Sequence, residues 1–346
     1  MKACVLHGIN DLRYEEVETP RPRDGEVLLK IRASGICGSD IPRVFTKGTY
    51  HFPTIPGHEF AGEIIETGAG VPLSYVGRNA AVFPLLPCRK CDMCEVGEYA
   101  SCRDYKYFGS RCDGGYAEFI AVPVWNLIFA DPCLSFEEAA MAEPAAVSLH
   151  ALNRARLQLG DTCAVYGAGP IGLMLAEFAK ASGASKVILA DIDEGKLTFA
   201  HSLGYTDTVN SSDERHLDEM MRMTSGKGVD IAFECSGASS AWENCLQCVK
   251  PQGEVVLMGN PLSDMHLKQK HYWEILRKQL SLHGTWNSSY TQKKNDWQTA
   301  IYSMAAGRLN IRPFITHRFE LKDCNKAFLL AKEKTEFYNK IMFVHS

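Results

Sequence analysis

Four cysteines in one short segment are the clearest sign of chemistry in this sequence. Cys88, Cys91, Cys94 and Cys102 follow a C-x2-C-x2-C-x7-C spacing. A segment of about 15 residues cannot form a packed core, but four thiolates can surround one tetrahedral zinc ion with Zn–S bonds near ~2.3 Å. No histidine pair follows and no basic stripe flanks the run, which is unlike a nucleic-acid-binding finger. The spacing predicts a closed structural zinc site, with a redox or iron–sulfur site as the alternative.

A second group of possible metal ligands lies upstream. Cys37 stands in the segment GICGSD (35–40), and His58 and Glu59 stand in PGHEFAG (56–62). A thiolate, an imidazole and carboxylates suit a zinc ion that keeps one position open for water or substrate. Taken singly, Cys37 could be a small buried hydrophobe and His58 a satisfied core histidine. Their combination, with glycines that allow the backbone to come close, favours a catalytic metal site.

A glycine-rich turn is the third feature with chemical meaning. The segment GAGPIG (167–172) follows an apolar run at 162–166 and precedes a stretch of helical composition that should end near Gly183. A second apolar run, 186–191, ends in Asp191 about 20 residues beyond the last glycine, as a dinucleotide fold requires. The expected cofactor-binding residues of the turn are Gly167, Gly169, Pro170, Ile171 and Gly172.

These residues predict a site for NAD. Backbone amides and the positive helix N-terminus would hold the pyrophosphate. Asp191 would accept hydrogen bonds from the adenosine ribose and repel a 2′-phosphate, so NAD is favoured over NADP. A helix–strand crossover without a ligand is the alternative.

The elements that must position these groups fall into three stretches. Residues 1–149 are rich in Gly, Pro and short β-like runs and favour a compact β-barrel-like catalytic domain. Residues 150–284 alternate helical segments with strand candidates, the pattern of a doubly wound parallel sheet; those candidates are 162–166, 186–191, 229–234 and 254–258. Residues 285–346 return to mixed character. We expect the active site in the cleft between the domains, at the carboxyl ends of the parallel strands.

Composition agrees with a two-domain enzyme. The chain has 346 residues, of which 46% are hydrophobic and 23% charged, enough to bury a large core. A net charge of -4 gives no reason to expect nucleic acid or a membrane as partner, and no apolar stretch could span a bilayer. Thirteen cysteines without a signal peptide indicate a reducing cytoplasm. Four of these are expected to be ordinary buried thiols, namely Cys4, Cys163, Cys245 and Cys248.

Segments along essentially the whole chain resemble the zinc-dependent medium-chain alcohol/polyol dehydrogenases. They include the two metal-ligand motifs, the cysteine run, DGGYAEF (113–119), Glu143-Pro144, the glycine turn and ECSG (234–237). Shorter segments are similar to galactitol-1-phosphate 5-dehydrogenases, namely SDIPRVF (39–45), FPLLPC (83–88), FGSR (108–111) and ILRK (275–278). The resemblance implies a GroES-like catalytic domain at 1–149, a Rossmann domain at 150–284, and a segment at 285–346 that returns to the catalytic domain. It also implies two zinc ions per chain, NAD, and a homo-oligomer, either a dimer or a tetramer.

The resemblance also implies roles for single residues. Cys37, His58, Glu59 and Glu143 would form the catalytic zinc environment, and Lys196 would join the cofactor site. Ser39 would pass the proton of the substrate hydroxyl toward solvent. Asp40 would orient His58 through its second ring nitrogen. A helix N-cap is the alternative for Ser39-Asp40, and both could hold together.

The implied reaction is oxidation of a secondary alcohol of a sugar alcohol, with hydride transfer to NAD. The substrate would be galactitol 1-phosphate, giving tagatose 6-phosphate. Arg43 and Lys47, in a loop-like segment between the two metal-ligand motifs, are candidate phosphate contacts, with solvated surface charge as the alternative. Trp286 and Asn287 could border the substrate, although Trp286 could be a core residue. Sorbitol, another polyol or L-threonine are alternative substrates, and a non-catalytic NAD-binding protein is the remote alternative.

Overall fold

The structure is a computed structural model that describes residues 1–261 and 263–345. It divides into two compact units. The first contains Met1–Ala146 together with the segment from Ser289 onward, and the second is Val147–Ser288. The sequence pattern predicted borders after residues 149 and 284, whereas the compact units change after Ala146 and Ser288. All the strands that were predicted to form the parallel sheet lie within the second unit.

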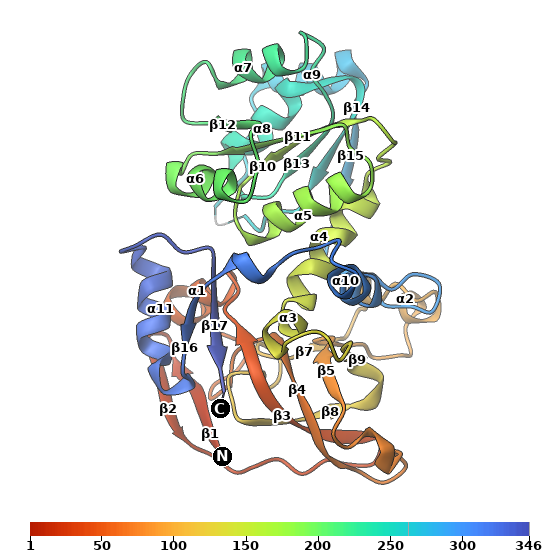
Figure 1. Cartoon of the computed structure of the whole chain (residues 1–346), viewed down its shortest axis with the longest axis vertical. Coiled ribbons are helices and arrows are strands. Elements are labelled where there is room, and N and C mark those ends of the chain that lie inside the picture. Colours follow the sequence, from red (N-terminus) through yellow and green to blue (C-terminus); the bar gives the residue numbers. More distant parts are fainter. Residues whose placement is uncertain (262, 346) are drawn as a thin grey trace. The chain divides into compact units, whose positions relative to one another are not determined.

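The second unit is built on a six-stranded sheet in which every pairing is parallel (Figure 1). Its strand order is β12-β11-β10-β13-β14-β15, so the order reverses between β10 and β13 as in a doubly wound dinucleotide-binding sheet. The strands are β10 (Thr162–Tyr166), β11 (Lys186–Asp191), β12 (Thr208–Asn210), β13 (Val229–Glu234), β14 (Val249–Leu257) and β15 (Ser281–Gly284). The predicted parallel sheet is confirmed, although β14 begins earlier than the predicted strand at 254–258.

Helices flank this sheet because its central strands are apolar on both faces. The strand residues 187–191 are all buried, which is typical of a parallel strand covered on both sides. Figure 1 shows α5 on one side of the sheet and α7, α8 and α9 on the other. The helices are α5 (Pro170–Ala181), α6 (Glu194–Ser202), α7 (His216–Met223), α8 (Ser239–Cys248) and α9 (Gln269–Lys278), with α4 (Ala142–Arg154) running across the border between the units.

The first unit contains a mixed seven-stranded sheet with the order β16-β17-β3-β4-β5-β9, in which β8 also pairs with β3. All pairings are antiparallel except that of β16 with β17. Two two-stranded sheets, β1-β2 and β6-β7, provide the other strands that the structure describes in this unit. They are β1 (Lys2–Gly8), β2 (Asp11–Glu16), β3 (Glu26–Gly35), β4 (Glu59–Thr67), β5 (Asn79–Val82), β6 (Leu85–Leu86), β7 (Lys106–Tyr107), β8 (Phe119–Pro123), β9 (Leu127–Phe129), β16 (Ile315–Phe319) and β17 (Lys340–Val344).

The segment that carries Arg43 and Lys47 is helical, so the expectation of a loop there is wrong. A short helix, α1 (Asp40–Pro42), continues directly into a π-helical turn, η1 (Arg43–Lys47). Asp40 and Val44 are buried, and these inward contacts hold the turn against the unit. The other helices of this unit are α2 (Asp92–Glu95), α3 (Phe136–Ala140), α10 (Asp296–Ala305) and α11 (Cys324–Glu333), with short 3-10 turns η2 (Leu73–Tyr75), η3 (Tyr99–Ser101), η4 (Val124–Asn126), η5 (Arg312–Phe314) and η6 (Leu321–Asp323).

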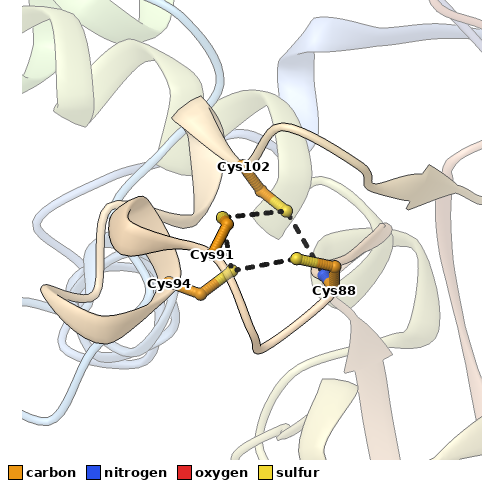
Figure 2. Close-up of side chains that lie close together, drawn as sticks. All are labelled: Cys88, Cys91, Cys94 and Cys102. Carbon is orange, nitrogen blue, oxygen red and sulfur yellow. Dashed lines mark hydrogen bonds between the residues drawn. The ribbon is translucent and has the colours of Figure 1, made fainter.

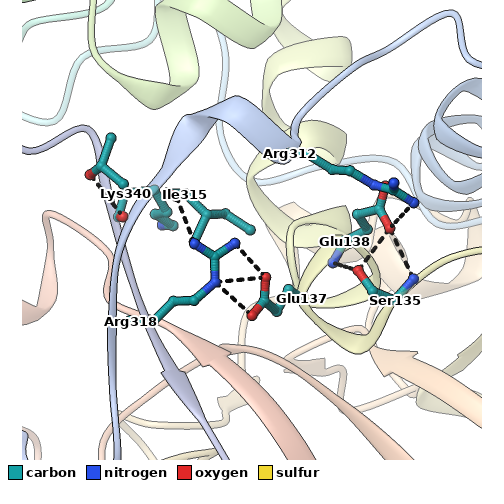
Figure 3. Close-up of polar contacts among 8 residues, drawn as sticks. Ser135, Glu137, Glu138, Arg312, Ile315, Arg318 and Lys340 are labelled. Atoms are coloured by element: carbon teal, nitrogen blue, oxygen red, sulfur yellow. Dashed lines mark hydrogen bonds and ion pairs between the residues drawn. The ribbon is translucent and has the colours of Figure 1, made fainter.

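Charged pairs fasten the C-terminal segment to the first part of the same unit (Figure 3). Arg312 Nε donates to Glu138 at 2.7 Å, and Arg318 Nη2 donates to Glu137 at 2.7 Å. Ser135 forms a capping box with Glu138 at the start of α3, which fixes the carboxylate that Arg312 binds. Strand β17 then pairs with β3, so the C-terminal segment joins the sheet that the N-terminal half begins.

All thirteen cysteines are free thiols. Cys4, Cys163, Cys245 and Cys248 are fully buried, as expected. In the part of the chain that the structure describes, no helix has the length and apolar character needed to cross a bilayer.

Candidate active site and zinc centres

The four cysteines of the first motif converge on one point (Figure 2). The sulfur of Cys91 lies 3.6 Å from that of Cys94 and 3.9 Å from that of Cys102, and the sulfurs of Cys88 and Cys94 are 4.0 Å apart. A tetrahedral zinc ion with Zn–S bonds of ~2.3 Å separates its sulfur ligands by about 3.8 Å. The donor set therefore fits zinc.

Local backbone geometry prepares the segment 88–102, the cysteine lobe, for a cation. The amide of Cys88 donates to the sulfur of Cys102 at 3.3 Å. A backbone hydrogen bond from Arg103 lowers the pKa of the Cys91 thiol to about 6, which favours a thiolate, whereas burial raises the pKa of Cys94 to about 12, so Cys94 is the thiol that needs a cation to ionise. Short turns, α2 and η3, bring the third and fourth cysteines back to the first two.

The second metal-ligand group also forms a cluster. Cys37, His58 and Glu59 each offer a donor atom, and these atoms lie within 4.8 Å of one another. Cys37 follows β3, whereas Glu59 begins β4, which pairs antiparallel with β3. Although burial opposes a charge on the ring, Asp40 and Cys37 raise the pKa of His58 well above its usual value. The negative groups that favour a charged His58 ring would also attract a metal cation, so these donor atoms fit a metal site.

Asp40 lies on the Nδ1 side of the His58 ring and is fully buried. Its Oδ1 is 3.6 Å from His58 Nδ1, and its Oδ2 accepts a hydrogen bond from the hydroxyl of Tyr116 at 2.7 Å. Burial opposes ionisation of Asp40, but the charges of His58 and Arg43 and the bond from Tyr116 hold the pKa of its carboxyl well below the usual range. Asp40 is therefore a fixed negative charge on the Nδ1 side of His58, where an orienting partner belongs.

Two further buried charges lie beside the cluster. Glu143, on α4, accepts a hydrogen bond from the Tyr107 hydroxyl at 3.3 Å, and burial raises the pKa of this carboxyl to about 7. Glu143 is not among the three residues whose donor atoms meet within 4.8 Å, so its role as a ligand stays a prediction. Lys340 forms an ion pair with Glu59, and these side chains are only 4% and 2% exposed. Lys340 also donates to the carbonyl of Ile36 at 3.0 Å.

Ser39 and the two candidate phosphate contacts differ in their surroundings. The hydroxyl of Ser39 donates to the sulfur of Cys37 at 3.3 Å and makes no capping bond at the start of α1. Arg43 donates to Asp40, so part of its guanidinium is already used. Lys47 is exposed.

The glycine turn has the geometry of a dinucleotide-binding loop. Gly167 has φ +113°, and a Cβ on Gly172 would lie 1.9 Å from the carbonyl oxygen of Gly167, so neither position accepts a larger residue. Helix α5 begins at Pro170, within the glycine-rich segment, and its first amides face outward from the helix end. Asp191 ends β11, accepts a bond from the amide of Ala168 at 2.8 Å and pairs with Lys196 Nζ at 3.2 Å. The turn and the acidic residue are thus joined directly.

Trp286 and Asn287 belong to the second unit. The side chain of Trp286 is 62% exposed, so the alternative that it is a core residue is wrong. Asn287 has φ +60°, a left-handed conformation that Asn tolerates. Their contact with substrate stays a prediction.

Comparison with known proteins assigns the family. An alcohol dehydrogenase GroES-like domain model matches residues 23–131, and a zinc-binding dehydrogenase model matches residues 170–306. The chain is 36% identical over 320 residues to galactitol 1-phosphate 5-dehydrogenase of Escherichia coli K12, and the match covers 92% of each protein. The chain belongs to the zinc-dependent medium-chain alcohol dehydrogenases.

Other members of this family are similar over the same length. The dehydrogenase is 32% identical to a sorbitol dehydrogenase of Bacillus subtilis over 333 residues, covering 94% of this chain and 92% of the relative. It is 34% identical to an L-threonine 3-dehydrogenase of Pyrococcus furiosus over 309 residues, covering 88% and 87%. These relatives act on different substrates, so the identity values alone leave the substrate open.

Solved structures agree with the assignment. The crystal structure of galactitol-1-phosphate dehydrogenase from E. coli superposes with a TM-score of 0.93 at 33% identity and covers 100% of both chains. An alcohol dehydrogenase from E. coli CFT073 complexed with NADH has a TM-score of 0.91 at 27% identity, covering 100% of this chain and 99% of the other. The cofactors of this dehydrogenase are zinc and NAD, and its two donor clusters provide for two zinc ions per chain.

Sequence reasoning missed Lys340, and it gave no role to Tyr107 or to Tyr116. Tyr116 lies within the DGGYAEF segment, so a signal for it was present. Lys340 carries no local signal, because its link to Glu59 depends on β17 lying beside β3.

Proposed function

We propose that this dehydrogenase oxidises the secondary hydroxyl of galactitol 1-phosphate to the keto-sugar phosphate, tagatose 6-phosphate, and transfers the hydride to NAD. The observation that carries the substrate assignment is the likeness to galactitol-1-phosphate dehydrogenase, which spans the full chain in structure at a TM-score of 0.93. In one segment that resembles this enzyme, 108–111, Gly109 packs against Gly57, the residue before His58.

The roles of the site residues follow from their contacts. Cys37, His58 and Glu59, whose donor atoms lie within 4.8 Å of one another, would hold the catalytic zinc, and Glu59 and Glu143 would exchange with water or substrate as ligands. Zinc bound there supplies Lewis acidity, which lowers the pKa of a substrate hydroxyl. Asp40 keeps the His58 ring in position from its Nδ1 side.

Ser39 takes the proton from the substrate hydroxyl and passes it toward solvent. Its hydroxyl lies 3.3 Å from the Cys37 sulfur, so it is next to the place where a substrate oxygen would be held. The secondary alcohol loses this proton from oxygen and a hydride from carbon. The products are the ketone, NADH and a proton released to water.

Substrate kinetics test the assignment. NAD reduction should be measured with galactitol 1-phosphate, free galactitol, sorbitol, phosphorylated and free pentitols, and L-threonine. We expect kcat/KM to be largest for galactitol 1-phosphate. Equal or better kcat/KM with free sorbitol, another free polyol or L-threonine would reject this substrate while leaving the zinc- and NAD-dependent dehydrogenase assignment intact.

A further inference from the structure

Arg111 lies between two tyrosine rings in the first unit. Its guanidinium carbon is 4.3 Å from the ring centroid of Tyr50 and 4.3 Å from that of Tyr105. Its Nη1 donates to the carbonyl of Tyr105 at 3.3 Å and its Nη2 to the Tyr50 hydroxyl at 3.2 Å. Throughout residues 1–261 and 263–345, no carboxylate pairs with this cation. The rings therefore fix the plane of the guanidinium without neutralising its charge.

The guanidinium of Arg111 keeps donors for a ligand. An arginine has five N–H donors. Two are used by Tyr105 and Tyr50, which leaves three for another acceptor. Arg43, by contrast, donates to the buried carboxylate of Asp40 and is part of the network beneath His58. A flat, pre-oriented guanidinium with free N–H groups matches the oxygens of a phosphate monoester.

Arg111 is held in a fixed position relative to the metal-ligand motif. Its amide donates to the carbonyl of Tyr107 at 2.9 Å, which closes a turn after β7. This turn packs against the residues that precede His58, because a Cβ on Gly109 would lie only 2.5 Å from the carbonyl oxygen of Gly57. The amide of Gly115 also donates to that oxygen at 2.8 Å. The backbone contact leaves little freedom between Arg111 and the cluster.

Aromatic contacts connect Arg111 with the donor cluster. The rings of Tyr105 and Tyr107 are 6.4 Å apart, and the rings of Tyr107 and His58 are 5.7 Å apart. From the C5 hydroxyl oxygen to the phosphorus on C1 an extended hexitol chain has seven bonds, and a chain advances about 3.5 Å for every three bonds, so these two atoms are about 8 Å apart. A substrate with its reacting hydroxyl beside His58 and its chain lying along Tyr107 would carry its phosphate toward Tyr105, the ring on which Arg111 stacks.

We propose that Arg111, held by Tyr50 and Tyr105, binds the phosphate group of the substrate and selects the phosphorylated polyol over the free one. The proposal rests on the proposed function, because it names the residue that reads the phosphate of that substrate. Arg111 gives the bidentate contact, and the Tyr50 hydroxyl lies next to the same edge of the guanidinium.

The test compares charge-removing variants on two substrates. Arg111→Gln removes the charge, and Arg111→Lys keeps it but lacks the flat fork. Arg78→Gln is the matched control, because Arg78 also stacks between two rings, 5.4 Å from that of Tyr75 and 3.3 Å from that of Phe129. Lys47→Gln examines the competing candidate. KM and kcat are measured for galactitol 1-phosphate and for galactitol, and thermal unfolding of each variant checks its folding.

We expect Arg111→Gln to raise KM for galactitol 1-phosphate roughly 10- to 100-fold, as loss of a charge-assisted contact does, with little change for galactitol. The KM of Arg111→Lys for galactitol 1-phosphate should lie between the values for Arg111→Gln and wild type. If Arg111→Gln does not fold, the Arg111→Lys variant decides the question. Arg78→Gln should leave KM and kcat unchanged for both substrates.

Four outcomes would overturn the inference. If wild type prefers the phosphate ester and Arg111→Gln keeps that preference, or if Lys47→Gln alone loses it, Arg111 is not the phosphate contact, while the proposed function stands. If wild type shows no preference for the ester, the proposed function fails and this inference fails with it. If wild type oxidises L-threonine best and Arg111→Gln loses that activity, the guanidinium binds a carboxylate instead.

Discussion

Replacing Lys340 with methionine should strongly destabilise the metal-free protein. Lys340 and Glu59 are 4% and 2% exposed, so the change leaves a buried carboxylate without its partner. Removing one member of a buried ion pair costs about 3–5 kcal/mol, far more than the ~0–1 kcal/mol of a surface pair. Lys340→Met should therefore lower the denaturant midpoint of the apoprotein markedly in guanidinium unfolding, with the change in free energy taken from the midpoint shift and the slope.

A double-mutant cycle makes this prediction specific. Glu59→Gln combined with Lys340→Met removes both charges, so the double variant should be less destabilised than the sum of the single variants by at least ~1 kcal/mol. Arg13→Met is the matched control, because Arg13 pairs with Asp11 in an exposed position. The reasoning is refuted if Lys340→Met stays within about 1 kcal/mol of wild type or if the two changes are additive. The apoprotein is essential, because a bound cation would pair with the stranded Glu59.

Three other predictions concern the metals, the cofactor and pH. A chelator should abolish turnover before the chain unfolds, because the cluster at Cys37 leaves a position open whereas the four thiolates of the lobe do not; metal analysis that finds the lobe emptied first would contradict this. Asp191→Ala should narrow the preference for NAD over NADP, measured as the ratio of kcat/KM values, because the carboxylate repels a 2′-phosphate; equal use of both by wild type would show that Asp191 does not select. Burial, with Arg32 and Lys30 nearby, lowers the pKa of His345 to about 4. Neutral His345 contributes up to roughly 3 kcal/mol to the free energy of unfolding. This contribution is fully present above the unfolded pKa of ~6.5 and is lost as the pH falls through about 4. His345→Gln should flatten that part of the stability curve, and an unchanged curve would rule out His345 as the cause.

The parallel sheet and the cysteine lobe could be predicted because their determinants are local. The strands at 162–166, 186–191 and 229–234 have the predicted bounds, since continuous apolar runs between helical stretches define them. The four cysteines meet because short turns join them, so spacing alone restricts which atoms can come together. Asp191 meets the glycine turn for the same reason, within one strand–helix–strand unit.

Predictions failed or stayed incomplete where the surroundings come from distant parts of the chain. The segment at 40–47 was expected to be a loop, but burial of Asp40 and Val44 holds it in helical turns. Arg43 was a candidate phosphate contact; it donates a hydrogen bond to Asp40, and its contact with substrate stays a prediction. No local pattern announces these contacts, because they depend on which side chains the fold places inside.

The sequence by itself thus determined which residues could bind zinc and NAD, because each motif carries its ligands within a few residues or within one supersecondary unit. Only the tertiary structure decided what surrounds those ligands. Lys340 reaches Glu59 because β17 pairs with β3, and Arg111 is stacked by Tyr50 and Tyr105 because a turn after β7 packs against the residues before His58. Register and backbone packing between distant segments set such contacts, and neither can be read from spacing along the chain.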